Sequence, residues 1–300
     1  MQACLFLGYL GTTHYNPAYD VSNTESTNDK EAIPMSTIIQ STWHSALQDP
    51  TGRRITRPRT SGKTMIIDKG LGIHAFEDLL QTASAHLDMI KIGFGTSPLY
   101  PHRLLQQKIQ LAKAHNVLIY PGGTFLEVAI AQNVLTSFFQ SIRQIGYTGI
   151  EVSDGTIELS RKQRNQLIRH SVDEGLTVIT EYGKKCWGSK IHLQELIETV
   201  TEDVSQGAEL VTIEGRESGE GVGIFDEHGA CKDEEILEVI QHVPNQQLLL
   251  WEAPQKSQQV HLIKLLGADI NLGNISVQEI LSLEALRRGL RSDTFVFRNN

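Results

Sequence analysis

Four glutamates each stand at the end of a short apolar segment, and they are Glu151, Glu181, Glu214 and Glu252. If these segments are strands of one parallel sheet, the four carboxylates converge and repel one another unless cations offset them. Lysine and arginine side chains or a divalent metal can do so. Because all the candidate ligands are oxygens and no HxH, HExxH or CxxC pattern is present, the residue types favour Mg2+ over zinc.

Cationic side chains lie at the same segment ends, and they are Lys69, Lys91, Lys184, Lys185 and Arg216. A purely structural network of ion pairs is therefore the alternative to a metal. Three turns place small residues before expected helix starts, namely PGGT (121–124), SDGT (153–156) and GNIS (273–276). Free N–H groups and the helix dipole favour anions at such positions. We expect a small, multiply anionic ligand, bound together with the metal.

The candidate anion-binding residues lie on different segment ends, and they are Lys91, Gly123, Thr124, Arg216, Ser218, Asn271 and Asn274. The eleven histidines fall outside these clusters, so the sequence offers no supported histidine base. No GxSxG or P-loop motif is present either. The expected chemistry therefore depends on carboxylates, lysines and backbone N–H groups.

The elements that position these residues follow from an alternation of short apolar and amphipathic segments after Lys63, which is typical of βαβ units. Eight strands are predicted, at residues 64–68, 88–92, 117–121, 149–153, 176–181, 210–214, 248–252 and 269–273. A helical pattern follows each strand. The fold class predicted is α/β, a (β/α)8 TIM barrel with an N-terminal extension, whose active site lies at the strand ends. A doubly wound sheet is the alternative, although no Gly-rich nucleotide turn follows the first strand.

The chain is predicted to divide near residue 50. Residues 1–50 show neither the apolar periodicity of a helix nor that of a strand, and they have the composition of a flexible N-terminal extension. The catalytic barrel is therefore assigned to residues 51–300. A basic run, Arg53–Arg59, precedes the first strand. We expect it to form a solvated arm or a contact to a neighbouring subunit, with a role at the active site as the alternative.

Composition narrows the class of protein. The net charge of -8 excludes a general binder of nucleic acid, and no apolar run approaches the roughly 18 residues of a membrane span. Three widely spaced cysteines, Cys4, Cys186 and Cys231, suggest a reducing compartment rather than a disulfide framework. We expect a cytoplasmic protein whose partners are small molecules, with neither nucleic acid nor membrane among them.

The strand-end motifs together resemble the phosphosulfolactate synthase family. The resemblance covers roughly residues 60–296 and includes every predicted strand end. Small departures, such as Tyr182 and Trp251, alter only apolar neighbours. The motifs are DKGL (68–71), KIGFGTS (91–97), YPGGTFLE (120–127), EVSDGTIE (151–158), TEYGKK (180–185), IEGRESGEGVGIFDEHG (213–229), EAPQKSQQV (252–260), NLGNI (271–275) and LEALRRGLRSDTF (283–295).

The resemblance implies Mg2+-dependent addition of sulfite to phosphoenolpyruvate, giving (2R)-2-phospho-3-sulfolactate, by a lyase-class enzyme acting in the synthetic direction. A lysine with a lowered pKa is expected to supply the proton, and Lys184 is the candidate, beside Lys185. Asp68 and Lys69 are also assigned to catalysis. A homo-oligomer is expected, and the product leads to coenzyme M or to free sulfolactate.

Two other functions remain open at this point. The same lysine can act as the Schiff-base nucleophile of an aldolase-type barrel enzyme. Alternatively, the chain can be a stress-associated barrel protein of the same family that no longer turns over substrate. The complete set of strand-end acids and lysines argues against the second of these.

Overall fold

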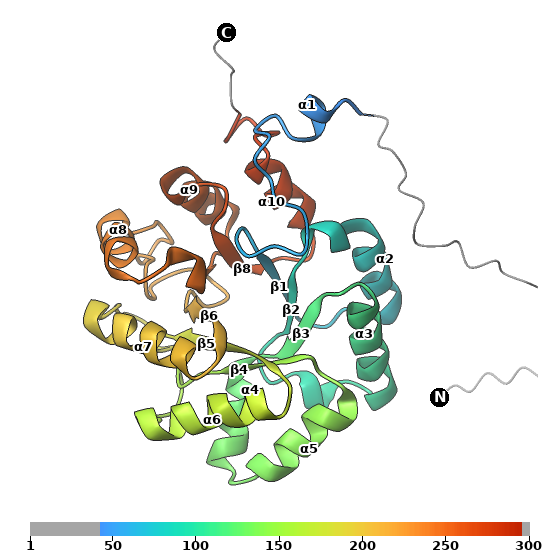
Figure 1. Ribbon diagram of the computed structural model, residues 1–300, viewed down its shortest axis with the longest axis vertical. Helices are drawn as coiled ribbons and strands as arrows, with labels where there is room; N and C mark the ends of the chain where they lie inside the picture. The colour runs from blue at the N-terminus through green and yellow to red at the C-terminus, as the bar shows by residue number, and fades with distance from the viewer. Residues whose placement is uncertain (1–42, 296–300) are drawn as a thin grey trace, which may run out of the picture. The chain divides into compact units, whose positions relative to one another are not determined.

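The computed structural model describes residues 43–295, in which eight parallel strands alternate with helices that surround them (Figure 1). The strands are β1 (Thr64–Asp68), β2 (Met89–Ile92), β3 (Leu118–Pro121), β4 (Gly149–Val152), β5 (Thr177–Tyr182), β6 (Ala208–Ile213), β7 (Leu249–Glu252) and β8 (Asn271–Ile275). The α-helices are α1 (Ser45–Gln48), α2 (Ile73–Ala83), α3 (His102–Ala114), α4 (Gly123–Ala131), α5 (Leu135–Ile145), α6 (Arg161–Asp173), α7 (Leu193–Ser205), α8 (Asp233–His242), α9 (Lys256–Leu266) and α10 (Ile280–Arg287). Every predicted strand is present, and its ends shift by at most two residues.

The sheet closes into a barrel. Its strand order is β3-β2-β1-β8-β7-β6-β5-β4, so β3 and β4 meet at the seam. At the seam the Thr148 N–H donates to the Ile119 carbonyl at 3.2 Å, and the Thr148 hydroxyl accepts from the Ile119 N–H at 2.9 Å. This arrangement confirms the predicted (β/α)8 barrel.

Strand alternation separates the apolar residues into two layers, because successive side chains of a strand point to opposite faces. Outward side chains such as Ile66, Ile90 and Val211 pack beneath the helices. Inward side chains fill the barrel, and they are Met65, Met89, Tyr120, Ile179, Leu210 and Leu250. A residue two positions beyond one of these continues the same inner face toward the mouth.

The N-terminal end of the barrel, which we call the base, is closed by the basic run. Arg54 pairs with Glu284 of α10 at 2.9 Å, and Arg59 pairs with Asp88 at 3.0 Å. Arg57 donates to the carbonyls at positions 84 and 116. The expectation of a solvated arm is therefore wrong for these three arginines, because carboxylates and backbone carbonyls of the barrel bind them.

The chain from Trp43 onward forms one compact unit, so residues 43–50 belong with the barrel. The carbonyl of Gln48 in α1 accepts from Arg288 at 3.1 Å. Residues 1–42, which make up most of the predicted extension, lie outside the described residues.

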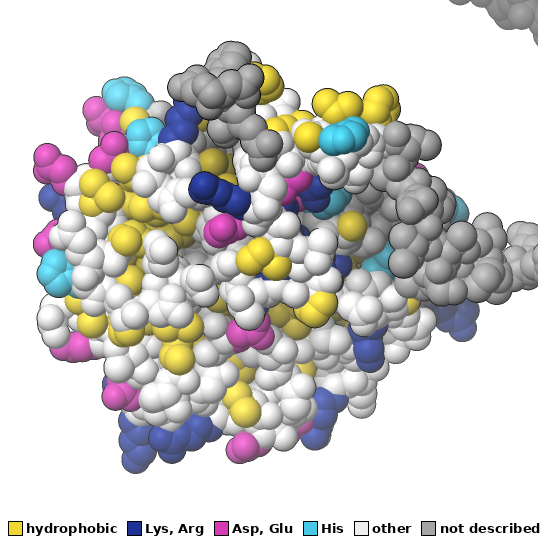
Figure 2. Space-filling model, turned by 45° about the horizontal axis from the view of Figure 1, so that its top comes forward, with side chains coloured by type: hydrophobic (Ala, Val, Ile, Leu, Met, Phe, Trp, Pro, Cys, Tyr) yellow, Lys and Arg dark blue, Asp and Glu magenta, His cyan; other side chains and the backbone are white. Residues whose placement is uncertain are grey.

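The surface of the described residues mixes charges of both signs. Figure 2 shows Lys and Arg side chains and Asp and Glu side chains interspersed over the drawn face. Within residues 43–295, none of the helices is both long and apolar enough to cross a bilayer.

Candidate active site

The four glutamates lie at the mouth of the barrel, on the inner face, and each is at most 3% exposed. Glu181 follows Ile179 of the inner apolar layer by two residues, and Glu252 follows Leu250 in the same way. Because the side-chain period of a strand is two, both carboxylates continue the inner face. The structure therefore brings together the carboxylates that the sequence placed at separate strand ends.

Lys91 of β2 occupies the centre of this cluster. Its Nζ lies 2.9 Å from a Glu151 carboxylate oxygen and 3.2 Å from oxygens of both Glu181 and Glu252. Burial by itself lowers the pKa of Lys91, but the three carboxylates outweigh burial and hold the pKa well above its usual range. Lys91 therefore offsets part of the negative charge of the glutamates, and its bonds to them occupy the nitrogen that we predicted would bind substrate.

The two adjacent lysines after β5 point to different sides of their loop. Lys185 Nζ binds Glu181 and lies 2.7 Å from Glu214, so it faces the cluster. Lys184 Nζ donates to the carbonyls of Asp154 at 2.8 Å and Ile157 at 3.1 Å, and it faces away. The structure thus brings Lys185, rather than Lys184, to the glutamates.

The electrostatic environment differs between the glutamates. Burial raises the pKa of Glu181, but Lys185 and Lys91 outweigh burial and lower this pKa to about 2. Burial prevails at Glu151, whose pKa rises to about 7. Burial and repulsion from Glu181 and Glu252 also raise the pKa of Glu214 well above its usual range. One carboxylate is thus firmly ionised, whereas two others resist ionisation.

The lysine pKa differs from the sequence expectation. Burial alone lowers the pKa of Lys185, but Glu181 and Glu214 outweigh it, and the pKa is raised instead. The expectation of a lowered lysine pKa is therefore wrong for the lysine that faces the cluster. The physical reason is that carboxylates, rather than other cations, are its nearest charged neighbours.

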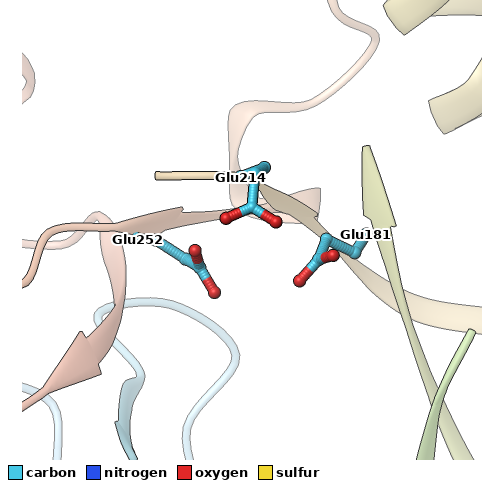
Figure 3. A group of neighbouring side chains, drawn as sticks. All are labelled: Glu181, Glu214 and Glu252. Carbon is cyan, nitrogen blue, oxygen red and sulfur yellow. The ribbon is translucent and has the colours of Figure 1, made fainter. Parts of the chain in front are cut away.

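Three of the glutamates can hold a metal ion. One carboxylate oxygen from each of Glu181, Glu214 and Glu252 lies within 4.8 Å of the other two, and the three carboxylates point toward a common space (Figure 3). Four carboxylates and two ammonium groups leave a charge of -2 when all are ionised, which one divalent cation would balance. An all-oxygen, negatively charged donor set fits a hard cation of the Mg2+ type.

Glu151 stands apart from this trio. One of its oxygens accepts from the Gly123 N–H at 2.6 Å, across the seam between β3 and β4. Its other oxygen is buried and has no hydrogen-bond partner among the described residues. The contact with Gly123 fixes the start of α4 against the cluster, so the proposed metal role of Glu151 has less geometric support than that of the other three.

Above the cluster is a cavity of about 180 Å3, lined by the cluster and by five of the predicted residues, Lys91, Gly123, Thr124, Arg216 and Asn274. The exposed Arg216 side chain has no ion pair within residues 43–295. Asn274 reaches the cavity because β8 carries an extra residue: Thr64 pairs with Leu272, but Ile66 pairs with Ile275. The cavity therefore joins carboxylates, ammonium groups, a guanidinium group and a helix start.

Four further predicted site residues lie outside the lining of this cavity, as Lys184 does. Asp68 points outward from β1 and pairs with Lys108 of α3, because its neighbour Ile67 takes the inner face. Asn271 begins β8, and its side chain accepts from the Lys63 N–H at 2.9 Å, at the base. Its placement at a strand end is wrong, because β8 starts two residues later than predicted. The other two residues lie in the loops after β1 and β6 but do not line the cavity: Lys69 pairs with Glu217, and Ser218 is exposed.

Sequence analysis assigned no role to Phe94, which lines the mouth. Phe94 is 42% exposed and adopts a φ of 55°, between two glycines. An aromatic residue flanked by glycines after a strand was the signal in the sequence, since such a side chain has few packing partners. Glu217 also lines the mouth, where it pairs with Lys69.

Comparison with known proteins extends these observations. Residues 52–293 match the family model of (2R)-phospho-3-sulfolactate synthase (ComA). Phosphosulfolactate synthase of Methanothermobacter thermautotrophicus is 40% identical over 246 residues, which are 81% of this chain and 95% of that protein. The enzymes of the same name from Methanocaldococcus jannaschii and Bacillus subtilis are 39% and 35% identical, and the matches span 78% and 81% of this chain and 94% and 95% of theirs.

Among solved structures, dihydrodipicolinate synthase from Agrobacterium tumefaciens is similar in fold alone. Its TM-score is 0.50 at 9% identity, over 78% of this chain and 76% of that chain. This likeness agrees with the barrel but says nothing of the chemistry. The match along residues 52–293 and the relatives at 35–40% identity show that the chain belongs to the phosphosulfolactate synthase family.

Proposed function

We propose that this protein catalyses the addition of sulfite to phosphoenolpyruvate, giving (2R)-2-phospho-3-sulfolactate. The observation that carries the proposal is the similarity to phosphosulfolactate synthases, which spans 94–95% of each relative's length. The mouth supports it, because fixed cations and three glutamates that can hold a metal ion surround a small cavity. Two small anionic substrates need such a set of charges.

Glu181, Glu214 and Glu252 would hold the Mg2+ ion, with Glu151 as a further candidate. When bound, Mg2+ supplies positive charge that stabilises the enediolate-like carboxylate formed during the reaction. Lys91 and Lys185 allow the glutamates to lie close together, because the two ammonium groups offset much of the repulsion between the carboxylates.

The reaction forms one carbon–sulfur bond and one carbon–hydrogen bond. The sulfur lone pair of sulfite attacks the methylene carbon of phosphoenolpyruvate, and the double-bond electrons move to the adjacent carbon and its carboxylate. A proton then binds the carbon that carries the phosphate. The phosphate ester is retained and nothing is oxidised. The enzyme must therefore bind three anionic groups, stabilise the added charge and deliver one proton.

Arg216, Thr124 and the start of α4 are placed to bind the substrate anions. All line the cavity, and the first N–H group of α4, that of Gly123, already donates to Glu151. A substrate oxygen would therefore bind at Thr124, in the same helical turn. A positive charge that is already in place costs no reorganisation during the reaction.

Lys185 is the proton donor that the geometry favours. It lines the cavity, whereas Lys184 does not. Its raised pKa keeps it protonated before sulfite attack, and the carbanion that forms next to the carboxylate is far more basic than an amine. Proton transfer to carbon is therefore downhill once the carbon–sulfur bond exists.

We also propose the synthetic direction within the carbon–sulfur lyase class, a homo-oligomeric assembly and a cytoplasmic location, where phosphoenolpyruvate is abundant. Mass analysis of the products of purified protein, phosphoenolpyruvate, sulfite and Mg2+ tests the activity. The expected result is phosphosulfolactate, abolished by excess EDTA and restored by added Mg2+. Undiminished turnover in EDTA rules out the metal.

Two other outcomes would identify the rival functions. Tight binding of phosphoenolpyruvate without product indicates a barrel that has lost turnover. Irreversible mass gain after borohydride treatment with a keto acid indicates Schiff-base chemistry. Phosphoenolpyruvate itself has no free carbonyl group, and for this reason we expect no such adduct.

A further inference from the structure

Lys185, which follows β5, is hydrogen-bonded to the loop between β4 and α6. Its backbone N–H donates to the Gly155 carbonyl at 3.1 Å. The neighbouring Lys184 fastens the same two loops together, because its ammonium group donates to the carbonyls of Asp154 and Ile157. The position of Lys185 therefore depends on where residues 153–157 lie.

The side chain of Lys185 also rests on this loop. A Cβ atom added to Gly155 would lie 2.9 Å from Cγ and 3.0 Å from Cε of Lys185. Only the absence of a side chain at position 155 lets the lysine stem pass so close. The stem then directs Nζ between Glu181 and Glu214.

A single buried carboxylate holds the loop from the other side. Glu127 of α4 is 1% exposed and accepts from the Gly155 N–H at 3.1 Å, from the Thr156 N–H at 2.9 Å and from the Ser153 hydroxyl. No cation pairs with Glu127 among the described residues, and Glu127 does not line the mouth cavity. A buried carboxylate without a counter-ion is costly unless several donors converge on it, as they do here.

We propose that Glu127 is a positioning residue of the active site. It fixes residues 153–156, and through Gly155 it sets the ammonium group of Lys185 between Glu181 and Glu214. The proposal rests on the catalytic role proposed above for Lys185. The three donors explain why residue 127 is a glutamate, because a carboxylate accepts from all of them. The NH2 group of a glutamine would instead face one of these N–H or O–H donors without an acceptor between them.

The test compares Glu127→Gln with Glu284→Gln. Glu284 is also a buried carboxylate, 4% exposed, but it lies at the base and pairs with Arg54. We expect Glu127→Gln to lower kcat about tenfold with KM for phosphoenolpyruvate changed less than about twofold, since slight misplacement of a reacting group is costly. Glu284→Gln, measured well below its melting temperature, should keep the wild-type kcat.

A double-mutant cycle separates positioning from general damage. In a Lys185→Met background, Glu127→Gln should lower kcat by less than about twofold more, because the group that it positions is gone. Multiplicative losses overturn the proposal. Should Glu127→Gln fail to fold, Ser153→Ala removes one of the three donors and should change kcat in the same direction by about threefold.

A second measurement does not depend on turnover. A brief acetic anhydride pulse followed by peptide mass spectrometry reports how fast Lys185 is modified. We expect at least about threefold faster modification of Lys185 in Glu127→Gln, and no change at the exposed Lys113. Wild-type rates at Lys185 in both Glu127→Gln and Ser153→Ala overturn the proposal. If the wild type does not join sulfite to phosphoenolpyruvate, the proposed function fails, and the acetylation rates still decide the role of Glu127.

Discussion

The mouth and the base of the barrel both bury charged side chains but balance them in opposite ways. At the base, guanidinium groups surround the carboxylates: Glu284 pairs with Arg54 and Arg288, and its pKa falls to about 2 because these hydrogen-bonded cations outweigh burial. At the mouth, carboxylates outnumber lysines, and the pKa of Glu151 rises to about 7, chiefly through burial. Buried charge by itself therefore does not mark an active site. The proposed active site differs from the base in having an excess of carboxylates over lysines beside a cavity.

The largest expected effect is at the two adjacent lysines of the mouth. Lys185→Met should lower kcat by about 10² or more, the usual scale for a lost general acid. Lys184→Met should lower it far less, because its ammonium group binds loop carbonyls rather than the cluster. Steady-state kinetics with phosphoenolpyruvate and sulfite checks both variants. The reverse ranking would return the proton-donor role to Lys184.

Substitutions at the base should lower the stability of the protein rather than its activity. Glu284→Gln should lower the free energy of unfolding by about 3 kcal/mol, because it leaves a buried Arg54 without its partner. The pH dependence has a definite sign. The folded-state pKa of Glu284 is lowered from 4.5 to about 2, so its contribution is present above the ordinary value and is lost as pH falls through this range.

Urea unfolding of wild type and Glu284→Gln between about pH 6 and pH 3 measures this difference. The gap between the two proteins should narrow toward the acid end of the series. A constant gap at all pH values would contradict the assignment of the base as a charge-balanced structural end.

A smaller effect on activity is expected at the rim of the mouth. Arg216→Ala should lower kcat/KM at least about tenfold, which corresponds to about 1.4 kcal/mol, because a cation without an ion pair is free to bind a substrate anion. Initial rates at low substrate concentrations give this ratio directly. An unchanged kcat/KM would mean that the Arg216 side chain is solvated and does not bind substrate.

The smallest effect is expected from the part of the chain before residue 43. Removal of residues 1–42 should leave kcat and the melting temperature unchanged, since the compact unit begins at Trp43. Removal of residues 1–60 is the matched comparison, because it also deletes the arginines that close the base, and it should lower the melting temperature strongly. Calorimetry and kinetics on both truncated chains check this. Lost activity without residues 1–42 would extend the functional unit into that segment.

The sequence by itself determined the eight strands and the convergence of the glutamates. Apolar segments alternating with amphipathic ones permit few folds, and side-chain alternation then assigns Glu181 and Glu252 to the inner face. These features depend on local pattern, which a single chain displays directly.

The tertiary structure decided which of two candidate residues of the same type faces the mouth. Lys185 rather than Lys184 does so, because Gly183 turns the chain with a φ of 126° where a side chain would collide with Glu214. Asn274 rather than Asn271 does so, because an extra residue in β8 shifts its register against β1. A shift of one residue in the register of a strand moves each of its side chains to the opposite face of the sheet. The local sequence pattern does not predict such a shift.

Charge states were also beyond the sequence. Glu151 and Glu181 are the same residue type on the inner faces of neighbouring strands, yet burial raises the pKa of Glu151 to about 7 and two lysines lower that of Glu181 to about 2. The basic run at the base similarly found buried partners in Asp88 and Glu284, 29 and 230 residues away. Electrostatic energies depend on distance and burial in three dimensions, so only the folded chain decides them.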